Sequence, residues 1–357
     1  MPHWKTILTY DGTPYNGWQI QPSLPTVQGT LAQAIHRVTG ETVLPQGSGR
    51  TDTGVHALAQ VATFSLSVPI PAANLHRALN RALPPSIRIL SVEVVSEDFH
   101  ARHSARRKTY EYRILPCGSH SHSDSHSHSH SEERICPPML APYVWACPLP
   151  LELAPLQQAA AHILGTHDFT SFAATDPDLT TRTATIDSPE SPNQISVTSK
   201  KSAIAQDNVI STEAAHSLIV SSAVDCSHRP QLQRTDSRRG IRQDPPHSAH
   251  TTTNPTPAHN ATSQNRIIPT DNTRTIFHSA WHQQEDLLIY RVTGSGFLHH
   301  MVRNLVGTFV EAAANRLSPD AIPKILAARN RAAAGPTAPA RGLFLVEVLY
   351  TDAEADS

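Results

Sequence analysis

The residues best suited to chemistry lie in the run Gly-Arg-Thr-Asp-Thr-Gly-Val-His-Ala at positions 49–57. Arg50 and Asp52 stand two residues apart between Gly49 and Gly54, and the glycines allow a tight turn and a close approach by a substrate. A carboxylate beside a guanidinium stays ionised, so Asp52 could act as a nucleophile or a base. The ordinary alternatives are a turn in which Asp52 bonds its own backbone and a surface ion pair for Arg50.

This run resembles the catalytic motif of the tRNA pseudouridine synthase A family, written G-R-T-D-x-G-V-H-A. Five further segments resemble the same family in the same order, at residues 10–19, 99–112, 164–172, 296–304 and 342–345. One short motif would be weak support. An ordered set that spans most of the chain outside two insertions is far more specific.

The resemblance implies an isomerase that converts uridine to pseudouridine in the anticodon arm of tRNA, at positions 38, 39 and 40. The reaction breaks the C1′–N1 glycosidic bond and rejoins the base to the sugar through C5. Because it needs no redox partner or group donor, we expect no cofactor. The target uridine would be extruded from the stem-loop, since a stacked base is out of reach. The family also implies a homodimer, in which one tRNA crosses both subunits.

The same resemblance implies a role for five side chains. Asp52 would be the essential catalytic residue, whether it attacks the sugar, attacks the base or removes the C2′ proton. Arg50 would hold an RNA phosphate or pair with Asp52, and Arg303 would form an ion pair with Asp52 across the cleft. Tyr110 would stack on the target base and serve in the later proton step, and Leu343 would pack against that base.

Three of these side chains also have an ordinary structural interpretation. Tyr110 lies in a run of alternating polar and aromatic residues that is typical of a strand, where a tyrosine is usually part of the core. Side chains two positions apart in a strand face the same side, so Tyr112 is a competitor for the stacking role and for the proton step. Arg303 follows apolar residues and could extend its stem along the surface, and Leu343 could be a core leucine.

Histidines near these motifs, namely His56, His167, His299 and His300, suggest a metal site. Their spacing offers no i, i+4 pair with a third ligand, so we predict hydrogen-bonded structural roles and no metal. The Ser-His run at residues 118–131 would bind Ni²⁺, Cu²⁺ or Zn²⁺ weakly. We interpret it as a tolerated low-complexity insertion rather than a metal sensor.

Composition excludes few functions. The 357 residues carry a formal net charge of −1, although residues 100–113 and 300–341 each carry a local excess of positive charge that suits a phosphate backbone. The four cysteines contain no C-x-x-C pair, which argues against zinc and redox motifs. The N-terminus lacks a signal-peptide core and no long apolar run is present, so we expect a cytoplasmic protein without membrane contact.

Hydrophobic periodicity predicts an α+β fold. Strands are predicted over residues 6–10, 61–64, 87–95, 287–292 and 344–350, and helices over 26–38, 74–83, 153–164, 297–314 and 319–328. We expect two halves with mixed or antiparallel sheets and packed helices: residues 1–113 with the aspartate loop, and residues 139–182 with 274–352. The family resemblance adds pseudo-twofold symmetry between the halves, joined sheets and a catalytic cleft between them.

Two segments fit neither half. Residues 114–138 form a connection that contains the Ser-His insertion, and residues 183–273 are rich in Ser, Thr, Asn, Pro and His. Such compositions bury too little apolar surface to offset the entropy of ordering, so we predict that both insertions are largely disordered. The sequence Thr-Arg-Thr recurs at 181–183 and 273–275, near which the long insertion should join the core.

Three other functions compete with the synthase. A catalytically silent relative could bind or chaperone tRNA, but a pure binder has no need of Asp52. A metal-handling module would depend on the Ser-His run. A metal-dependent RNA hydrolase would use Asp52 with His56 and would be abolished by chelators.

Overall fold

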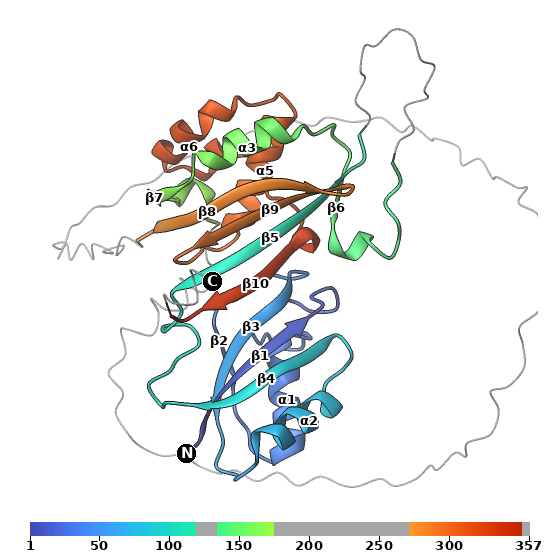
Figure 1. Cartoon of the computed structure of the whole chain (residues 1–357), viewed down its shortest axis with the longest axis vertical. Helices are drawn as coiled ribbons and strands as arrows, with labels where there is room; N and C mark the ends of the chain where they lie inside the picture. The colour runs from blue at the N-terminus through green and yellow to red at the C-terminus, as the bar shows by residue number, and fades with distance from the viewer. Residues whose placement is uncertain (119–133, 175–270, 352–357) are drawn as a thin grey trace, which may run out of the picture. The chain divides into compact units, whose positions relative to one another are not determined.

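Ten strands form the framework of the protein in a computed structural model that describes residues 1–118, 134–174 and 271–351 (Figure 1). The strands hydrogen-bond in the order β4-β1-β3-β10-β5-β9-β8-β7, while β2 pairs with β3 and β6 pairs with β5. All pairs are antiparallel except β10 with β3 and β5 with β6. The strands span His3–Tyr10 (β1), Gln46–Gly47 (β2), His56–Ser65 (β3), Ile87–Val95 (β4), Arg107–Pro116 (β5), Trp145–Cys147 (β6), Gly165–Asp168 (β7), Thr273–Gln284 (β8), Leu287–Gly294 (β9) and Leu343–Leu349 (β10).

Helices α1 (Val27–Thr39) and α2 (Ala72–Ala82) lie against the N-terminal strands (Figure 1). The side chain of Thr26 caps α1 by accepting from the amide of Gly29, and Gly40 ends the helix in the left-handed region at φ 77°. The apolar stripe of α1 is fully buried at Leu31 and Ile35. The 3.6-residue period in the sequence therefore marks the face that packs on the sheet.

Helices α3 (Leu153–Ala161) and α5 (Met301–Ala313) pack beside β8 and β9, and α6 (Ile322–Ala328) contacts β7 (Figure 1). In this part Trp281 and Tyr290 stack at 5.0 Å, and Phe309 of α5 meets Tyr290 edge-on at 5.4 Å. Single 3₁₀ turns occur at Ala141–Tyr143, Thr170–Phe172, Pro319–Ala321, Arg331–Ala333 and Ala340–Gly342.

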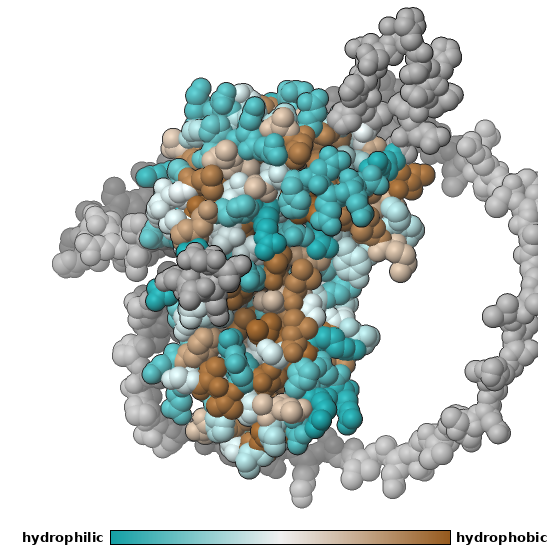
Figure 2. Space-filling view, in the orientation of Figure 1, coloured by the Kyte–Doolittle hydropathy of each residue, from teal (hydrophilic) through white to brown (hydrophobic). Residues whose placement is uncertain are grey.

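Strand β10 joins the two parts of the molecule. It comes from the end of the chain yet lies between β3 and β5, so one sheet continues from the N-terminal into the C-terminal half. On the face shown in Figure 2, apolar residues gather over β10 and β3. Many hydrophilic residues lie over α3 and α6, at the top of the view. The α+β class and the joined sheets expected from the sequence are confirmed.

Several predicted boundaries shift. Strand β3 begins at His56 rather than 61, and the helix predicted from 297 begins at Met301. The helix predicted over 319–328 is a 3₁₀ turn followed by α6. Strand β8 was not predicted. The predicted end of the N-terminal half at residue 113 falls inside strand β5. The division into two halves stays a prediction.

All the residues that the structure describes belong to one compact unit. The Ser-His run after residue 118, and residues 183–270 of the predicted long insertion, lie outside the described residues, as do the disorder predictions made for them. Across the described ranges, none of the helices is long and apolar enough to cross a membrane.

Candidate active site

The loop that carries Asp52 is held by the segment that follows β1. The backbone amide of Trp18 donates to the carbonyl of Thr51 at 3.0 Å, and the hydroxyls of Tyr10 and Thr51 are 2.8 Å apart. The loop closes on itself through the amide of Val55, which donates to the carbonyl of Asp52 at 3.1 Å. The carboxylate therefore projects from a backbone that has little freedom to move.

Glycine is required where this loop is approached most closely. A Cβ atom on Gly12 would lie 2.0 Å from the carbonyl oxygen of Val55, which no side chain can occupy. Gly54 adopts φ 77°, a left-handed conformation that permits the turn after Asp52. Glycine thus serves close packing at position 12, outside the motif, and turn geometry at position 54, within it.

The second part of the site comes from the beginning of α5. Residue His300 has φ 59°, so the chain turns there and the helix starts at Met301. This places Arg303 on the first turn, where its Nη1 donates to Oδ2 of Asp52 at 3.0 Å and its Nε donates to the carbonyl of Ala338 at 2.8 Å. The ion pair predicted between Arg303 and Asp52 is present in the structure.

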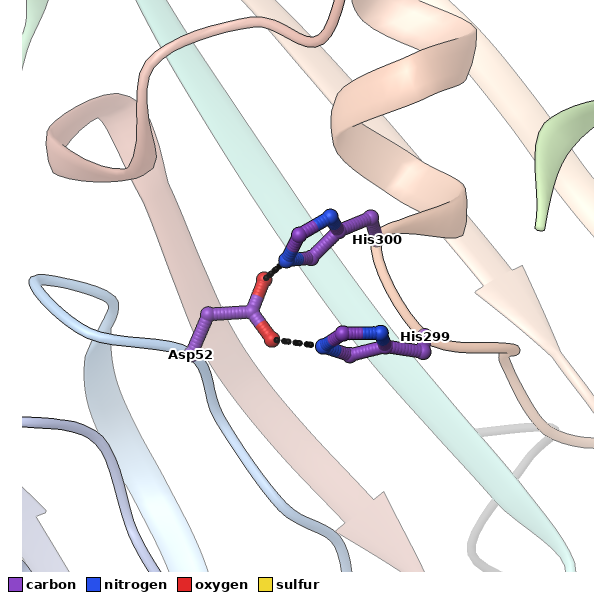
Figure 3. Close-up of side chains that lie close together, drawn as sticks. All are labelled: Asp52, His299 and His300. Carbon is purple, nitrogen blue, oxygen red and sulfur yellow. Dashed lines mark ion pairs between the residues drawn. The ribbon is translucent and has the colours of Figure 1, made fainter. Parts of the chain in front are cut away.

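Two histidines complete the surroundings of the carboxylate (Figure 3). His299 Nε2 lies 3.4 Å from Oδ1 of Asp52, and His300 Nε2 lies 3.3 Å from Oδ2. The side chain of Asp52 is 19% exposed, so three basic groups share a carboxylate that is mostly shielded from water. Residue spacing in the sequence does not place these histidines in the site, although they precede the predicted partner Arg303 by only three and four residues.

These contacts keep Asp52 ionised. Burial by itself would raise the pKa of Asp52, but the hydrogen bond from His299, the charge of His300 and the bond and charge of Arg303 outweigh it and lower the pKa. The pKa of His300 is itself lowered, chiefly by burial. Arg303 is therefore the permanent positive partner of the carboxylate near neutral pH.

A cleft of about 660 Å³ opens over Asp52. Arg50, Tyr110 and Leu343 line this cleft together with Asp52, and Arg303 is bonded to Asp52, so the five side chains to which the resemblance assigns a role lie together. The cleft also contains several residues that were not singled out, among them Arg102, Lys108, Arg274, Phe297, His299, His300 and Arg331. Its dimensions suit a small, flat organic group such as a nucleobase with its sugar.

Tyr110 and Tyr112 are separated in function by their surroundings. Tyr110 lies in the cleft and meets the ring of Phe297 edge-on at 5.0 Å, whereas the hydroxyl of Tyr112 donates to the carbonyl of Pro339 at 2.7 Å. Burial, with smaller contributions from Tyr10 and Asp52, raises the pKa of Tyr110, so its phenol stays protonated. Of the two tyrosines, Tyr110 is therefore the one that lines the cleft.

Comparison with known proteins decides the family. The model of a family described as tRNA pseudouridine synthase matches residues 7–104 and 258–351. A protein from Solibacter usitatus named tRNA pseudouridine synthase A is 35% identical over 347 residues, which cover 97% of this chain and 98% of the relative. The chain belongs to the tRNA pseudouridine synthase family. Membership makes it an enzyme, an isomerase of tRNA modification.

Two further relatives of this synthase match over nearly the full chain. Proteins named tRNA pseudouridine synthase A are 33% identical in Moorella thermoacetica, over 98% of this chain and 100% of the relative, and 32% identical in Maridesulfovibrio salexigens, over 97% and 89%. The resemblance found in the sequence motifs is thereby confirmed.

The other two histidines singled out from the sequence, His56 and His167, have structural partners. His56 is buried, receives the amide of Gly12 at Nδ1 and contacts the carbonyl of Pro142 through Nε2 at 3.1 Å. His167 contacts the carbonyl of Leu164 at 2.7 Å. Both contacts agree with the hydrogen-bonded roles predicted for these two residues.

One group could in principle hold a metal ion. Among the residues that the structure describes, potential ligand atoms of Asp52, His299 and His300 lie within 4.8 Å of one another. A cation there would meet the guanidinium of Arg303, which already occupies Oδ2 of the same carboxylate. This arrangement disfavours a resident metal on electrostatic grounds, and the absence of a metal requirement stays a prediction.

Proposed function

We propose that this synthase converts uridine to pseudouridine at positions 38, 39 and 40 of the tRNA anticodon stem-loop, with Asp52 as its catalytic residue. The observation that carries the catalytic assignment is the ionised carboxylate of Asp52, held by Arg303 and two histidines at the floor of a cleft. The choice of the anticodon arm rests on the resemblance of the motifs to the synthase A family.

The chemistry balances without an external reagent. The C1′–N1 bond breaks, a C5–C1′ bond forms, and the proton on C5 is lost while N1 gains one. Asp52 serves this sequence by attacking C1′, by adding to C6 or by removing the C2′ proton, and each route needs an ionised carboxylate. An ion pair with Arg303 keeps the carboxylate in that form.

The cleft must hold the uracil while it is detached and turned. Tyr110 offers an aromatic surface and Leu343, which is 5% exposed, offers an apolar one. Both lie in the cleft that contains Asp52, so an extruded base would be confined near the carboxylate. Arg50 is exposed at the same cleft and is suited to hold an RNA phosphate.

We also propose that the synthase is a homodimer that acts in the cytoplasm on tRNA. The family resemblance and the tRNA substrate class support these proposals. Light scattering coupled to size exclusion should give about twice the 38.9 kDa chain mass for the protein without RNA.

Pseudouridine formation at each anticodon-arm uridine of unmodified tRNA, measured with EDTA present, tests the function. Wild type should convert uridines 38–40, and Asp52→Asn should convert none. Asp320→Asn, at a 90% exposed position, is the matched control and should behave as wild type. Wild-type protein that binds tRNA but converts nothing would favour the silent tRNA-binding alternative.

A further inference from the structure

Lys108 is a cation in the cleft to which the chemistry above gives no role. It lies on β5 two residues before Tyr110, so the two side chains share one face of the strand, and both line the cleft. The Nζ atom of Lys108 donates to the carbonyl of Ser48 at 2.6 Å. The ammonium group is therefore fixed against the segment that leads directly into the catalytic loop.

Two arginines from other parts of the fold share this region with Lys108. Arg102 comes from the loop between β4 and β5, and Arg274 comes from β8. Both line the same cleft, and both act on Lys108 electrostatically. Among the described residues, no carboxylate forms an ion pair with Lys108.

This placement is unfavourable for a cation in the absence of a ligand. Burial first, and then the charges of Arg102 and Arg274, lower the pKa of Lys108 to about 8. A lysine that only carried a surface charge would have no reason to lie in such a position. An anion bound between the three side chains would remove the repulsion and restore the ammonium charge.

We propose that Arg102, Lys108 and Arg274 form a binding site for a backbone phosphate of the RNA, beside the nucleotide that enters the cleft. The proposal rests on the proposed function, because it takes RNA as the ligand. Lysine and arginine are the side chains that most often hold phosphates, and the three come from separate elements that meet at the cleft. The site would fix the register of the RNA against Asp52.

Proton uptake is a consequence that distinguishes this site from an ordinary basic surface. At a pKa of about 8, roughly nine-tenths of the free amines are charged at pH 7 and about a quarter at pH 8.5. Bound phosphate requires the charged form, so RNA affinity should fall about fourfold between these pH values through this group alone.

Most of the other ionisable groups of the cleft keep one charge state in that pH range. Arginine side chains keep their charge. Asp52 and Asp271 have lowered pKa values and stay ionised, Tyr110 has a raised pKa and stays protonated, and His300 has a lowered pKa and stays neutral. The charged or titratable side chains that line the cleft with Arg102, Lys108 and Arg274 are Arg50, Asp52, Tyr110, Asp271, His299, His300 and Arg331.

A purely structural role is the rival explanation, since Lys108 also holds the carbonyl of Ser48. Two variants separate the roles. Lys108→Gln keeps a hydrogen-bond donor but removes the charge, whereas Lys108→Arg keeps a charge that does not titrate. Lys324→Gln, at an exposed position on α6, is the control for loss of one positive charge.

The experiment measures binding of unmodified tRNA by full-length protein that carries Asp52→Asn, so that no turnover occurs. Affinity is recorded against salt concentration at pH 7 and pH 8.5. Calorimetry at pH 8 in two buffers of different ionisation enthalpy gives the number of protons taken up. The same calorimetry with inorganic phosphate alone tests whether the site accepts a free anion instead of a phosphodiester.

The proposal predicts uptake of about half a proton per site at pH 8 with tRNA. Lys108→Gln should abolish this uptake and lower the slope of log affinity against log salt by about 1. Lys108→Arg should keep the slope but lose the pH dependence. Lys324→Gln should change neither.

Other outcomes would overturn the proposed phosphate site. Unchanged salt slope and unchanged proton uptake in Lys108→Gln would leave only the structural role. Equal uptake with inorganic phosphate and with tRNA, and no change in the salt slope of Lys108→Gln, would assign the site to a small anion. If the protein binds no tRNA at all, the proposed function and this site fail together. If tRNA binds and Lys108→Gln has no effect, only this site fails.

Discussion

Removal of the Arg303 guanidinium is the sharpest test of how the site controls its carboxylate. In Arg303→Met, Oδ2 of Asp52 loses a donor at 3.0 Å and the carbonyl of Ala338 loses a donor at 2.8 Å. Asp52 keeps its burial, which raises its pKa, but loses the permanent charge that opposes it. The carboxylate should therefore become easier to protonate.

The size of the expected loss in kcat/KM follows from how far the ion pair of Arg303 and Asp52 is shielded from water. The side chains of Arg303 and Asp52 are 15% and 19% exposed, so the pair is shielded but not fully buried. Hydrogen bonds to charged groups in such sites contribute about 1.5–3 kcal/mol. If that free energy is lost from the reactive form, kcat/KM at pH 7 should fall by about 10- to 150-fold.

The assay is the pH dependence of kcat/KM for pseudouridine formation. The ionised form of Asp52 is the active one, so the acid limb of the profile should move to higher pH in Arg303→Met and return part-way in Arg303→Lys. Arg316→Met removes an ion pair to Glu311 of the same helix. Arg316 lies just beyond the helix and is 56% exposed, so its loss should leave the profile unchanged. A wild-type profile in Arg303→Met, at unchanged melting temperature, would refute the reasoning.

Three further predictions use other parts of the site. Tyr110→Phe should lower kcat by about 100-fold or more if the phenol takes part in the proton step, while RNA affinity measured by filter binding stays within about twofold. Tyr112→Phe should lose only its hydrogen bond to Pro339, which lowers the free energy of unfolding in denaturant by about 1 kcal/mol. Gly12→Ala must displace the carbonyl of Val55 and should destabilise the protein by about 1–3 kcal/mol, measured the same way; an unchanged unfolding midpoint would contradict this packing. EDTA dialysis should leave the conversion rate unchanged, and restoration of a lost rate by added Zn²⁺ would contradict the metal-free site.

The catalytic loop could be predicted from the sequence because its determinants are local. Glycines that permit a turn, an acidic residue and a basic residue all lie within six positions, so their proximity needs no knowledge of the fold. The pairing with Arg303 was available only through the family resemblance. The two residues are 251 positions apart, and nothing in composition or periodicity brings such partners together.

The start of α5 was misjudged for a physical reason. Phe297, Met301, Leu305 and Phe309 continue one apolar stripe, which predicts a helix from 297. Residues 297–300 are a loop that still packs against the core, and Phe297 contacts Tyr110. Apolar spacing reports burial, and it does not reveal that His300 adopts a left-handed conformation.

Strand β8 escaped prediction because its pattern is broken. Ile276 and Trp281 are its buried apolar residues and stand five positions apart, which does not fit a period of two. The register shifts between Ile276 and His278, and such an irregularity moves the following side chains to the other face. The strand is recognisable only through its pairing with β9.

The two histidines beside Asp52 show how one long-range contact brings others with it. Once Arg303 is expected to reach Asp52, residues three and four positions before it must lie near the same carboxylate, although no spacing rule for metal ligands selects them. Their effect is set by the arginine. Because Arg303 supplies a permanent charge and burial lowers the pKa of His300, the arginine is the main positive partner of the carboxylate near neutral pH. A loss of activity on acidification that His300→Gln leaves in place should therefore report protonation of Asp52 itself.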